Sequence, residues 1–352
     1  MTIDPGPIEP EATARTAPGR RDEPQIVEFT SKHVADAARL YAADFGRLRA
    51  DVPALPADFL DPATTEPLLR RAISAGPAAA ALRHGELVGY MAGLPVPGLR
   101  ASGTSVFLPE WAHGGTRTGR SDTYDAMYTY IAARWAEAGW LTQCLSILPG
   151  DPKLEGALVW LGFGLCVVDA VRTLEEVPVS ATPPGVTVGQ AAPEDLDALV
   201  PIVPAHDAYY AASPTFLIRE TNDPSHELAS WIQTRGEQVL FARSGIRVLS
   251  FIYLRPAPDD VSRVVRHPGT MSICGAYTVP EARRSGVGSA LLSAAVASGR
   301  EAGFERMAVD FESANVLARR FWLRSFRPVC LTFERHLDDR LARPGTAPSD
   351  QP

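Results

Sequence analysis

The chain has 352 residues, and its 41 Asp and Glu residues outnumber its 34 Lys and Arg residues, which gives a formal net charge of −7 at pH 7. An acidic chain of this kind lacks the basic surface of nucleic-acid-binding proteins. The longest apolar run, residues 87–99, is interrupted by two prolines and is too short to cross a bilayer. The length allows two domains of ordinary size. We therefore expect a two-domain globular protein without a nucleic-acid or membrane partner.

The cysteines and the chain ends bear on location and disorder. The N-terminal tail, residues 1–24, carries no secretion signal. Like residues 340–352, it is rich in Pro, Gly, Thr and Asp, which predicts disorder. Each cysteine lies in an apolar run without metal-binding spacing, so we expect buried reduced thiols, no metal ion and a cytoplasmic protein. The four cysteines are Cys144, Cys166, Cys274 and Cys330.

The first half of the chain, residues 25–176, alternates predicted strands and helices as a mixed α/β domain does. A Pro-rich linker, residues 177–185, separates it from the second half. The predicted helices begin at Ser31 and near residues 68, 124 and 152, and a loop is expected over residues 109–120. The predicted strands are residues 25–30, 78–83, 87–94, 105–108, 140–148 and 165–174.

The same order returns in residues 186–339, the second predicted domain. Short sequence matches accompany it: Glu137-Ala138-Gly139-Trp140 parallels Glu301-Ala302-Gly303-Phe304, and Trp160 parallels Trp322. Matches at a nearly constant offset indicate a duplication. We expect an α/β (α+β) fold of two tandem domains, each a mostly antiparallel twisted sheet flanked by helices. In the second domain the predicted strands are residues 186–190, 239–242, 247–254, 271–279, 307–311 and 329–336, and the predicted helices are residues 194–203, 227–235, 287–302 and one from 314.

One junction in the second domain has the features of an anion site. The strand that ends at Val279-Pro280 is followed by Arg283-Arg284-Ser285-Gly286-Val287-Gly288 and then by an amphipathic helix. A helix start combines unpaired backbone N–H groups with the positive end of the helix dipole, and both favour a phosphate. Glycines let the backbone approach a ligand closely, and the arginines add positive charge. Neither a GxxxxGK[ST] motif nor a GxGxxG motif occurs at this junction.

This loop resembles the (Q/R)-x-x-G-x-(G/A) motif of the GNAT superfamily, the acetyl-CoA-dependent N-acetyltransferases. Downstream, Asn315, Ala318, Phe321 and Trp322 resemble the N-x-x-A-x-x-(L/F)-Y block of that family. The tandem arrangement is similar to that of mycothiol synthase. The resemblance implies acetyl-CoA as co-substrate, with contacts from the strand end, the loop and the following helix. These contacts are Tyr277, Thr278, Val279, Arg283, Arg284, Ser285, Gly286, Val287, Gly288, Ser289, Asn315 and Trp322.

The first domain departs from this pattern. Its loop over residues 109–120 contains glycines and arginines but not the spacing of the family motif. We expect a degenerate copy there that supports the fold, and coenzyme binding in this half stays open.

Acetyl transfer to an amine needs a base, a hydrogen-bond donor for the carbonyl oxygen and a proton for the leaving thiolate. Asp310 and Glu312 alternate onto one face at a strand end and are candidate bases, although Glu312 is equally explained as a cap of the next helix. His206 lies in a segment that lines the acceptor pocket in relatives, and it is a base candidate or a surface residue. Relatives carry Tyr where this chain has Trp322, whose indole is no acid at neutral pH, so Tyr277 or water is expected to protonate the thiolate.

The resemblance and these residues predict transfer of an acetyl group from acetyl-CoA to the primary amine of a small molecule, by direct attack in a ternary complex in the second domain. One alternative is a non-catalytic acyl-CoA- or metabolite-binding protein, which Trp322 favours. Another is a protein or peptide N-terminal acetyltransferase, which the long segment 204–223 disfavours. The oligomeric state stays open, and a monomer fits because tandem domains form a pseudo-dimer.

Overall fold

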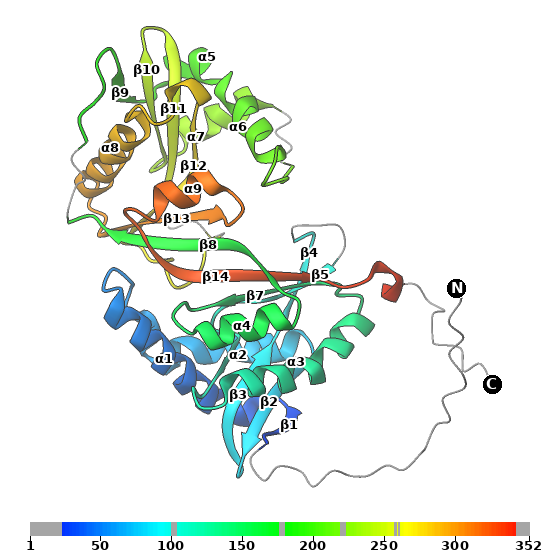
Figure 1. The fold of residues 1–352 in the computed structure, drawn as a ribbon. Coiled ribbons are helices and arrows are strands. Elements are labelled where there is room, and N and C mark those ends of the chain that lie inside the picture. Colours follow the sequence, from blue (N-terminus) through cyan, green and yellow to red (C-terminus); the bar gives the residue numbers. More distant parts are fainter. Residues whose placement is uncertain are drawn as a thin grey trace, which may run out of the picture.

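The computed structural model of the chain describes residues 23–99, 104–175, 180–218, 223–256, 259 and 261–342. Nearly all of the two tails predicted to be disordered lies outside these residues, as do residues 177–179 of the predicted linker. The short 3-10 helix η5 (Asp339–Ala342) continues past the predicted end of the second domain. Figure 1 shows two lobes, the first half below and the second half above, with long strands between them.

The first half follows the predicted order. Apolar residues such as Tyr41 and Phe45 recur on one side of the first long helix and bury it against the sheet. Asp61 and Asp151 cap two helices that begin with proline, because each side chain accepts a hydrogen bond from a first-turn N–H. The elements are β1 (Gln25–Glu28), η1 (Ser31–His33), α1 (Val34–Asp51), η2 (Asp58–Leu60), α2 (Pro62–Ala75), β2 (Ala78–Arg83), β3 (Glu86–Ala92), β4 (Leu94–Pro97), β5 (Thr104–Leu108), β6 (His113–Gly115), α3 (Arg120–Glu137), β7 (Thr142–Ile147), α4 (Pro152–Trp160) and β8 (Gly164–Thr173).

The second half repeats this order with one break. The helix predicted over residues 194–203 is interrupted before the next helix begins, because Pro201 and Pro204 supply no N–H to continue it. The elements are β9 (Thr187–Gln190), η3 (Pro193–Asp195), α5 (Leu196–Leu199), α6 (Ile202–Ala211), α7 (Pro224–Gln233), β10 (Gln238–Ser244), β11 (Arg247–Pro256), β12 (Thr270–Thr278), η4 (Pro280–Ala282), α8 (Val287–Glu301), β13 (Arg306–Glu312), α9 (Val316–Trp322) and β14 (Arg327–His336).

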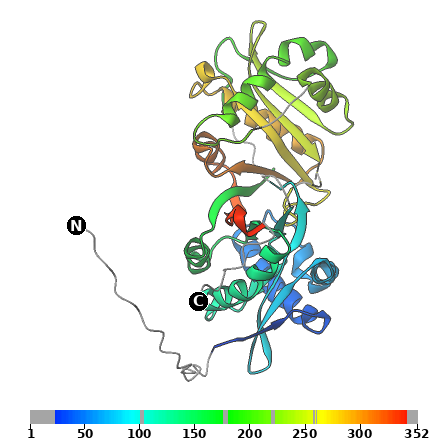
Figure 2. The same cartoon turned by 90° about the vertical axis from the view of Figure 1, so that its right-hand side faces the viewer.

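The strands form two sheets. The smaller sheet has the order β1-β2-β3-β6, and the larger has the order β4-β5-β7-β14-β8-β13-β12-β11-β10-β9. In the second half, α8 packs on one face of the larger sheet, and α5, α6 and α7 pack on the other. Figure 2 shows the larger sheet passing from one lobe into the other. The mixed α/β fold class predicted from the sequence is confirmed.

The last strand of each half pairs with the other half. β8 lies between β14 and β13, and β14 lies between β7 and β8. The apolar cluster beneath α1 takes in residues of both halves, including Phe45, Ala308 and Val329. Across the same boundary, Arg306 donates from Nε to the carbonyl oxygen of Ala54 at 2.7 Å. The two halves are therefore joined through one shared sheet, a feature that the element order alone did not predict.

Two short strands were not predicted. β6 falls inside the expected loop 109–120, because three residues are too few for a periodic pattern. β4 contains two prolines, and such a strand is tolerated because it lies at the edge of the larger sheet, where N–H groups need no ladder acceptor. Two helices also begin earlier than predicted, α2 at Pro62 and α3 at Arg120.

The described residues also bear on membranes, metals and thiols. No helix among them combines the length and the apolar character needed to cross a bilayer. No three His, Cys, Asp or Glu side chains among them gather in a way that could hold a metal ion. None of the four cysteines forms a disulfide in the described residues, and of the four thiols expected to be buried only Cys144 and Cys330 are fully buried.

Candidate functional site

β12 and β13 pair over only part of their length. Their parallel register ends where Ile273 lies opposite Val309, and beyond this point the two strands separate. β12 stays paired with β11 throughout, but Cys274 is skipped in that register. Such a β-bulge bends its strand. The bulge thus lies at the point where β12 and β13 separate.

The predicted anion loop joins β12 to α8. Gly286 is the N-cap of α8 with φ 91°, and no side chain caps this helix. Arg284, with φ 61°, is also left-handed. Left-handed residues in such a loop turn successive N–H groups toward one concave side, and the first N–H groups of α8 have no helical acceptor. The structure therefore brings together the predicted diphosphate contacts Arg283, Arg284, Ser285, Gly286, Val287, Gly288 and Ser289 at one helix start.

Asn315 begins α9 directly after β13. Its Oδ1 accepts a hydrogen bond from the backbone N–H of Ala318 (3.1 Å) and a second from the hydroxyl of Tyr209 (2.8 Å). These bonds use both lone pairs of Oδ1, so the Nδ2–H groups are what remains to meet a ligand. Tyr209 belongs to α6. The two helices are thus tied together next to the separation of β12 and β13.

Arg283 and two tyrosines form a wall on the α6 side. The guanidinium carbon of Arg283 lies 4.9 Å from the ring centroid of Tyr209 and 5.6 Å from that of Tyr277. Its Nε donates to the carbonyl oxygen of Thr278 at 3.0 Å, which fixes the guanidinium. Burial raises the pKa of Tyr209, while the Arg283 charge acts to lower it. Tyr209 is therefore a neutral phenol beside a fixed positive charge.

His206 lies beneath this wall. Its side chain is in α6 and only 3% exposed. The ring makes edge-on contacts with Tyr210, Phe251 and Tyr277, with centroids 4.9, 5.7 and 5.9 Å away. The alternative of a surface histidine in a loop is wrong, because α6 packs on the sheet through this position. Burial among aromatic rings leaves His206 without the access that a base for an incoming amine needs.

Asp310 and Glu312 share one face of β13, as predicted. They lie on the face away from α8, because Val309 and Phe311 pack in the apolar cluster with that helix. Asp310 is exposed and Glu312 is half-buried. Asp169 of β8 stands directly opposite Asp310 in the register, and burial together with the Asp310 charge raises the pKa of Asp169 well above its usual value. Asp310 is thus an accessible carboxylate at the strand separation.

Two expectations about the residues around α9 need correction. Glu312 does not cap α9, because the side chain of Asn315 does. Trp322 is 5% exposed and packs edge-on against Phe321 and Phe326, with centroids 4.8 and 5.6 Å away. Trp322 is therefore part of the apolar core, and its predicted contact with the coenzyme has no support in this geometry.

Some backbone groups at the end of β12 already make hydrogen bonds within the protein. Val279 donates its N–H to the carbonyl oxygen of Leu249, and its own carbonyl accepts from the N–H of Ala282. Its N–H is therefore occupied, and its backbone contact with the coenzyme stays a prediction that only the carbonyl could fulfil. The carbonyl of Tyr277 accepts from the hydroxyl of Ser250 at 2.8 Å.

The first half has a strand separation of the same kind. β5 runs parallel to β7 only as far as Leu108 opposite Leu145, and the chain then turns into β6 of the smaller sheet. Gly119, with φ 67°, is the N-cap of α3, and Asp151 caps α4. The starts of α3 and α4 therefore lie beside the separation of β5 and β7. The starts of α8 and α9 lie in the equivalent positions beside the separation of β12 and β13.

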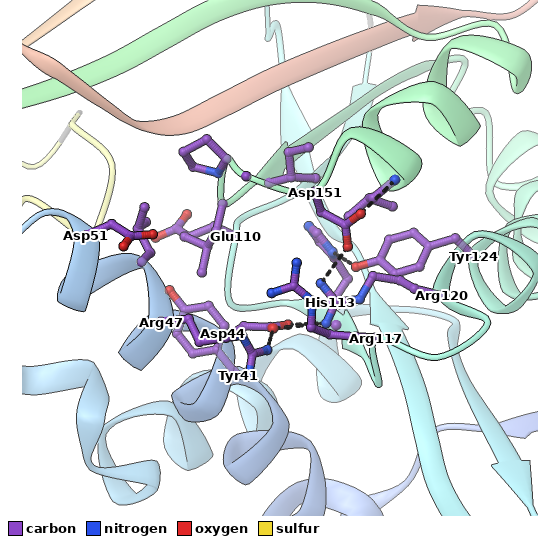
Figure 3. Close-up of a pocket in the computed structure, with 17 residues that line it drawn as sticks. Tyr41, Asp44, Arg47, Asp51, Glu110, His113, Arg117, Arg120, Tyr124 and Asp151 are labelled. Atoms are coloured by element: carbon purple, nitrogen blue, oxygen red, sulfur yellow. Dashed lines mark hydrogen bonds and ion pairs between the residues drawn. The ribbon is translucent and has the colours of Figure 1, made fainter.

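Ion pairs fill the corresponding place in the first half. A cavity of about 80 Å³ lies there (Figure 3). Arg120, the first residue of α3, pairs with Asp44 of α1 at 2.7 Å and with Asp151 at 3.3 Å, and it also donates to the carbonyl oxygen of Gly115. Arg47 makes a second ion pair with Asp44. The path between the starts of α3 and α4 is thus crossed by a buried guanidinium.

Two buried groups on the cavity wall have perturbed pKa values. Burial raises the pKa of Glu110 to about 7. Burial lowers the pKa of His113 to about 4, which keeps its ring neutral. The neutral ring lies 2.7 Å from both the hydroxyl of Tyr124 and the carbonyl oxygen of Ser146, so Nε2–H donates to the carbonyl and Nδ1 accepts from the hydroxyl. Both ring nitrogens of His113 are therefore hydrogen-bonded within the cavity wall.

Sequence reasoning missed three features of these sites. Gly275 was a signal for the bulge at Cys274, because a glycine inside a strand often marks one. Arg120 was a signal for the filled cavity, because a charged residue follows the helix-cap glycine there, whereas Val287 does in the second half. The role of Tyr209 had no sequence signal, since it depends on how α6 packs.

Residues 205–326 match the family model described as the acetyltransferase (GNAT) family. The second half carries a GNAT domain. The matched range runs from α6 to the residue before β14, so it includes the strand separation, the loop before α8 and the start of α9. Members of this family use acetyl-CoA, and the chain is an acetyl-CoA-dependent acyltransferase. A comparison with curated proteins gives no match.

Solved structures resemble this chain over most of its length. A GCN5-related N-acetyltransferase from Sphaerobacter thermophilus is 14% identical and matches over 90% of this chain and 96% of its own, with a TM-score of 0.54. A GCN5-related N-acetyltransferase from Kribbella flavida is 13% identical over 92% of this chain and 73% of its own, with a TM-score of 0.39. The first likeness covers 90% of this chain and so includes both halves, whose fold is shared.

Proposed function

We propose that this chain transfers an acetyl group from acetyl-CoA to the primary amine of a small molecule, and that its second half does so. One observation carries the proposal. The uncapped start of α8, with left-handed Gly286 after two arginines, lies beside the separation of β12 and β13, within the segment that matches the GNAT family. A diphosphate and the arm attached to it need such a helix start next to such an opening between strands.

The described residues fit the coenzyme in three places. The N–H groups of the loop and the first turn of α8 would hold the diphosphate, with Arg284 adding charge. The Nδ2–H groups of Asn315 would donate to a carbonyl of the pantetheine arm, since Oδ1 is already occupied. The backbone at the bulge near Cys274, beside the strand separation, would donate to the thioester carbonyl oxygen as negative charge develops on it. Acetyl-CoA supplies the thioester, and the chain supplies position and hydrogen bonds.

The first half supports the same assignment by contrast. Arg120 crosses the path that the pantetheine arm would need there and binds Asp44 and Asp151. Displacing this buried guanidinium would break both pairs and leave Asp151 without its cation, and breaking a buried pair typically costs about 3–5 kcal/mol. No comparable ion pair among the described residues crosses between the starts of α8 and α9. We infer one coenzyme per chain, bound in the second half.

The chemistry requires a free amine held near the thioester. An alkylammonium has a pKa of about 10, so a base must take its proton at neutral pH. Asp310 is exposed on the open face of β13 and is the stronger candidate, directly or through water, and half-buried Glu312 is the second. Holding the two reactants together makes the largest contribution to lowering the activation barrier, roughly 7–11 kcal/mol.

The experiment that tests the proposal is thiol release from acetyl-CoA with a panel of small primary amines and peptides. Release with small amines, and not with peptides, supports the proposal. Release with peptide N-termini alone would favour a peptide acetyltransferase. Binding of acetyl-CoA without any release would favour a non-catalytic binding protein, the alternative to which the core position of Trp322 lends weight.

A further inference from the structure

We propose that Tyr209 of α6 gives the leaving thiolate its proton. The inference rests on the proposed function and adds a catalytic residue to it. Trp322, at the position where an acid was expected from the family block, is buried against Phe321 and Phe326. An indole offers a hydrogen bond but no usable acid. The proton must therefore come from another side chain or from water.

Tyr209 is the phenol that the structure brings to the coenzyme's path. Its hydroxyl lies 2.8 Å from Oδ1 of Asn315, the residue whose Nδ2–H groups are proposed to bind the arm. Ser250 and Thr278 also carry hydroxyls near this point, but they are bound to each other at 2.8 Å, and aliphatic alcohols are much weaker acids than a phenol. Rotation about the C–O bond is enough to turn the Tyr209 O–H from Asn315 toward a sulfur.

The charge environment suits a proton donor. Burial raises the pKa of Tyr209, so the phenol carries its proton at neutral pH. The Arg283 guanidinium, 4.9 Å from the ring centroid, is held by its bond to the carbonyl of Thr278 and would stabilise the phenolate as it forms. The aromatic ring of Tyr277, 5.9 Å away, packs against Tyr209 and limits its motion.

The step balances as follows. The amine nitrogen attacks the thioester carbonyl carbon and forms the C–N bond, while its excess proton passes to Asp310 or to water. The tetrahedral intermediate collapses, the C–S bond breaks, and its electron pair stays on sulfur. Sulfur takes the proton of Tyr209, which leaves coenzyme A as the thiol. The phenolate of Tyr209 regains a proton from solvent, so that no other reactant is consumed.

The test is Tyr209→Phe, assayed with acetyl-CoA and with its selenoester analogue. The variant keeps the ring against Arg283 and Tyr277 and loses only the hydroxyl. A selenolate is a weaker base than a thiolate and leaves without a proton. We expect turnover with acetyl-CoA to fall about 100-fold, turnover with the selenoester to fall less than about tenfold, and the dissociation constant of coenzyme A, measured by calorimetry, to stay within about threefold of the wild type.

The other outcomes are distinct. Equal losses with both esters, or a large loss of coenzyme affinity, would show that Tyr209 only positions Asn315. Unchanged turnover would exclude any role, and a selective loss in Tyr277→Phe instead would assign the proton to that residue. Tyr90→Phe is the matched control, because it removes a buried tyrosine hydroxyl that donates to the carbonyl oxygen of Trp111 in the first half, away from this site. A wild type that releases no thiol with any amine would overturn the proposed function, and this role with it.

Discussion

The hydroxyl of Tyr209 lies 2.8 Å from Oδ1 of Asn315 and ties α6 to α9 beside the point where β12 and β13 separate. In the first half, the equivalent tie between α1 and α4 is ionic and runs from Asp44 through Arg120 to Asp151. A hydroxyl hydrogen bond is worth about 1 kcal/mol net, whereas breaking a buried ion pair costs several. The second half can therefore open for a ligand at low cost, and the first half cannot.

Asn315 has two separable roles, as a helix cap and as a ligand donor. Asn315→Ser keeps a capping oxygen and loses the Nδ2–H groups, and Asn315→Ala loses both. We expect both variants to weaken coenzyme binding by a similar factor, roughly 2- to 10-fold for one hydrogen bond. Only the alanine variant should lower the free energy of unfolding, by about 1 kcal/mol. Calorimetry and urea denaturation measure the two quantities. A serine variant with wild-type affinity would remove Asn315 from the coenzyme site.

A substitution at Gly288 tests whether the coenzyme diphosphate approaches the backbone closely at the start of α8. A methyl group there would lie 3.6 Å from its nearest neighbours, Phe321 and Thr278, so nothing in the fold requires glycine. Alanine is the better helix former by up to about 1 kcal/mol. We expect Gly288→Ala to be at least as stable as the wild type in thermal unfolding and to bind coenzyme A roughly tenfold more weakly, a difference of about 1.4 kcal/mol. Full affinity in this variant would argue against a diphosphate at this helix start.

Asp310 is expected to matter most at low pH. A base is needed while the amine is protonated. The base matters less as the pH approaches the amine pKa of about 10, because more of the amine is then already neutral. Asp310→Asn should slow turnover about 100-fold near pH 6.5 and less than about tenfold near pH 9.5. Glu312→Gln, on the same face, is the comparison. An equal loss of turnover at every pH would mean that Asp310 has a structural role. A larger loss in Glu312→Gln than in Asp310→Asn would instead identify Glu312 as the base.

Glu110 links stability to pH. Its pKa is about 7 in the folded chain and 4.5 in the reference state, so the folded state binds the proton more tightly. Stability from this group is present at low pH and is lost as the pH rises toward 8, by roughly 2–4 kcal/mol for a shift of this size. Glu110→Gln removes that loss. In urea denaturation, the variant should match the wild type near pH 5 and exceed it near pH 8, and a constant difference would contradict the buried carboxyl.

The sequence was most informative where a pattern repeats locally. The loop before α8 could be located because glycines, arginines and a following amphipathic helix occur together along the chain. Most elements were placed within a few residues for the same reason. The exchange of β8 and β14 could not be predicted, because strand pairing across 160 or so residues leaves no local pattern.

In the candidate site, too, residues in local motifs could be predicted from the sequence, and residues placed by tertiary packing could not. Gly286 and Asn315 sit at helix starts, where local motifs specify the conformation, and both were identified. Trp322 was assigned to the coenzyme by its place in a motif, although its bulk and apolarity suit the core that it occupies. The contact of Tyr209 with Asn315 was missed because it joins helices that are more than 100 residues apart in the chain.

The most direct measurement for this account is a calorimetric titration of the full chain with coenzyme A, using two matched variants. Gly286→Asp and Gly119→Asp place the same charge at the equivalent helix caps, both left-handed, of α8 and α3. We expect one coenzyme per chain in the wild type, no binding in Gly286→Asp, and unchanged binding in Gly119→Asp. Two coenzymes per chain, or binding lost only in Gly119→Asp, would contradict the assignment of the site to the second half.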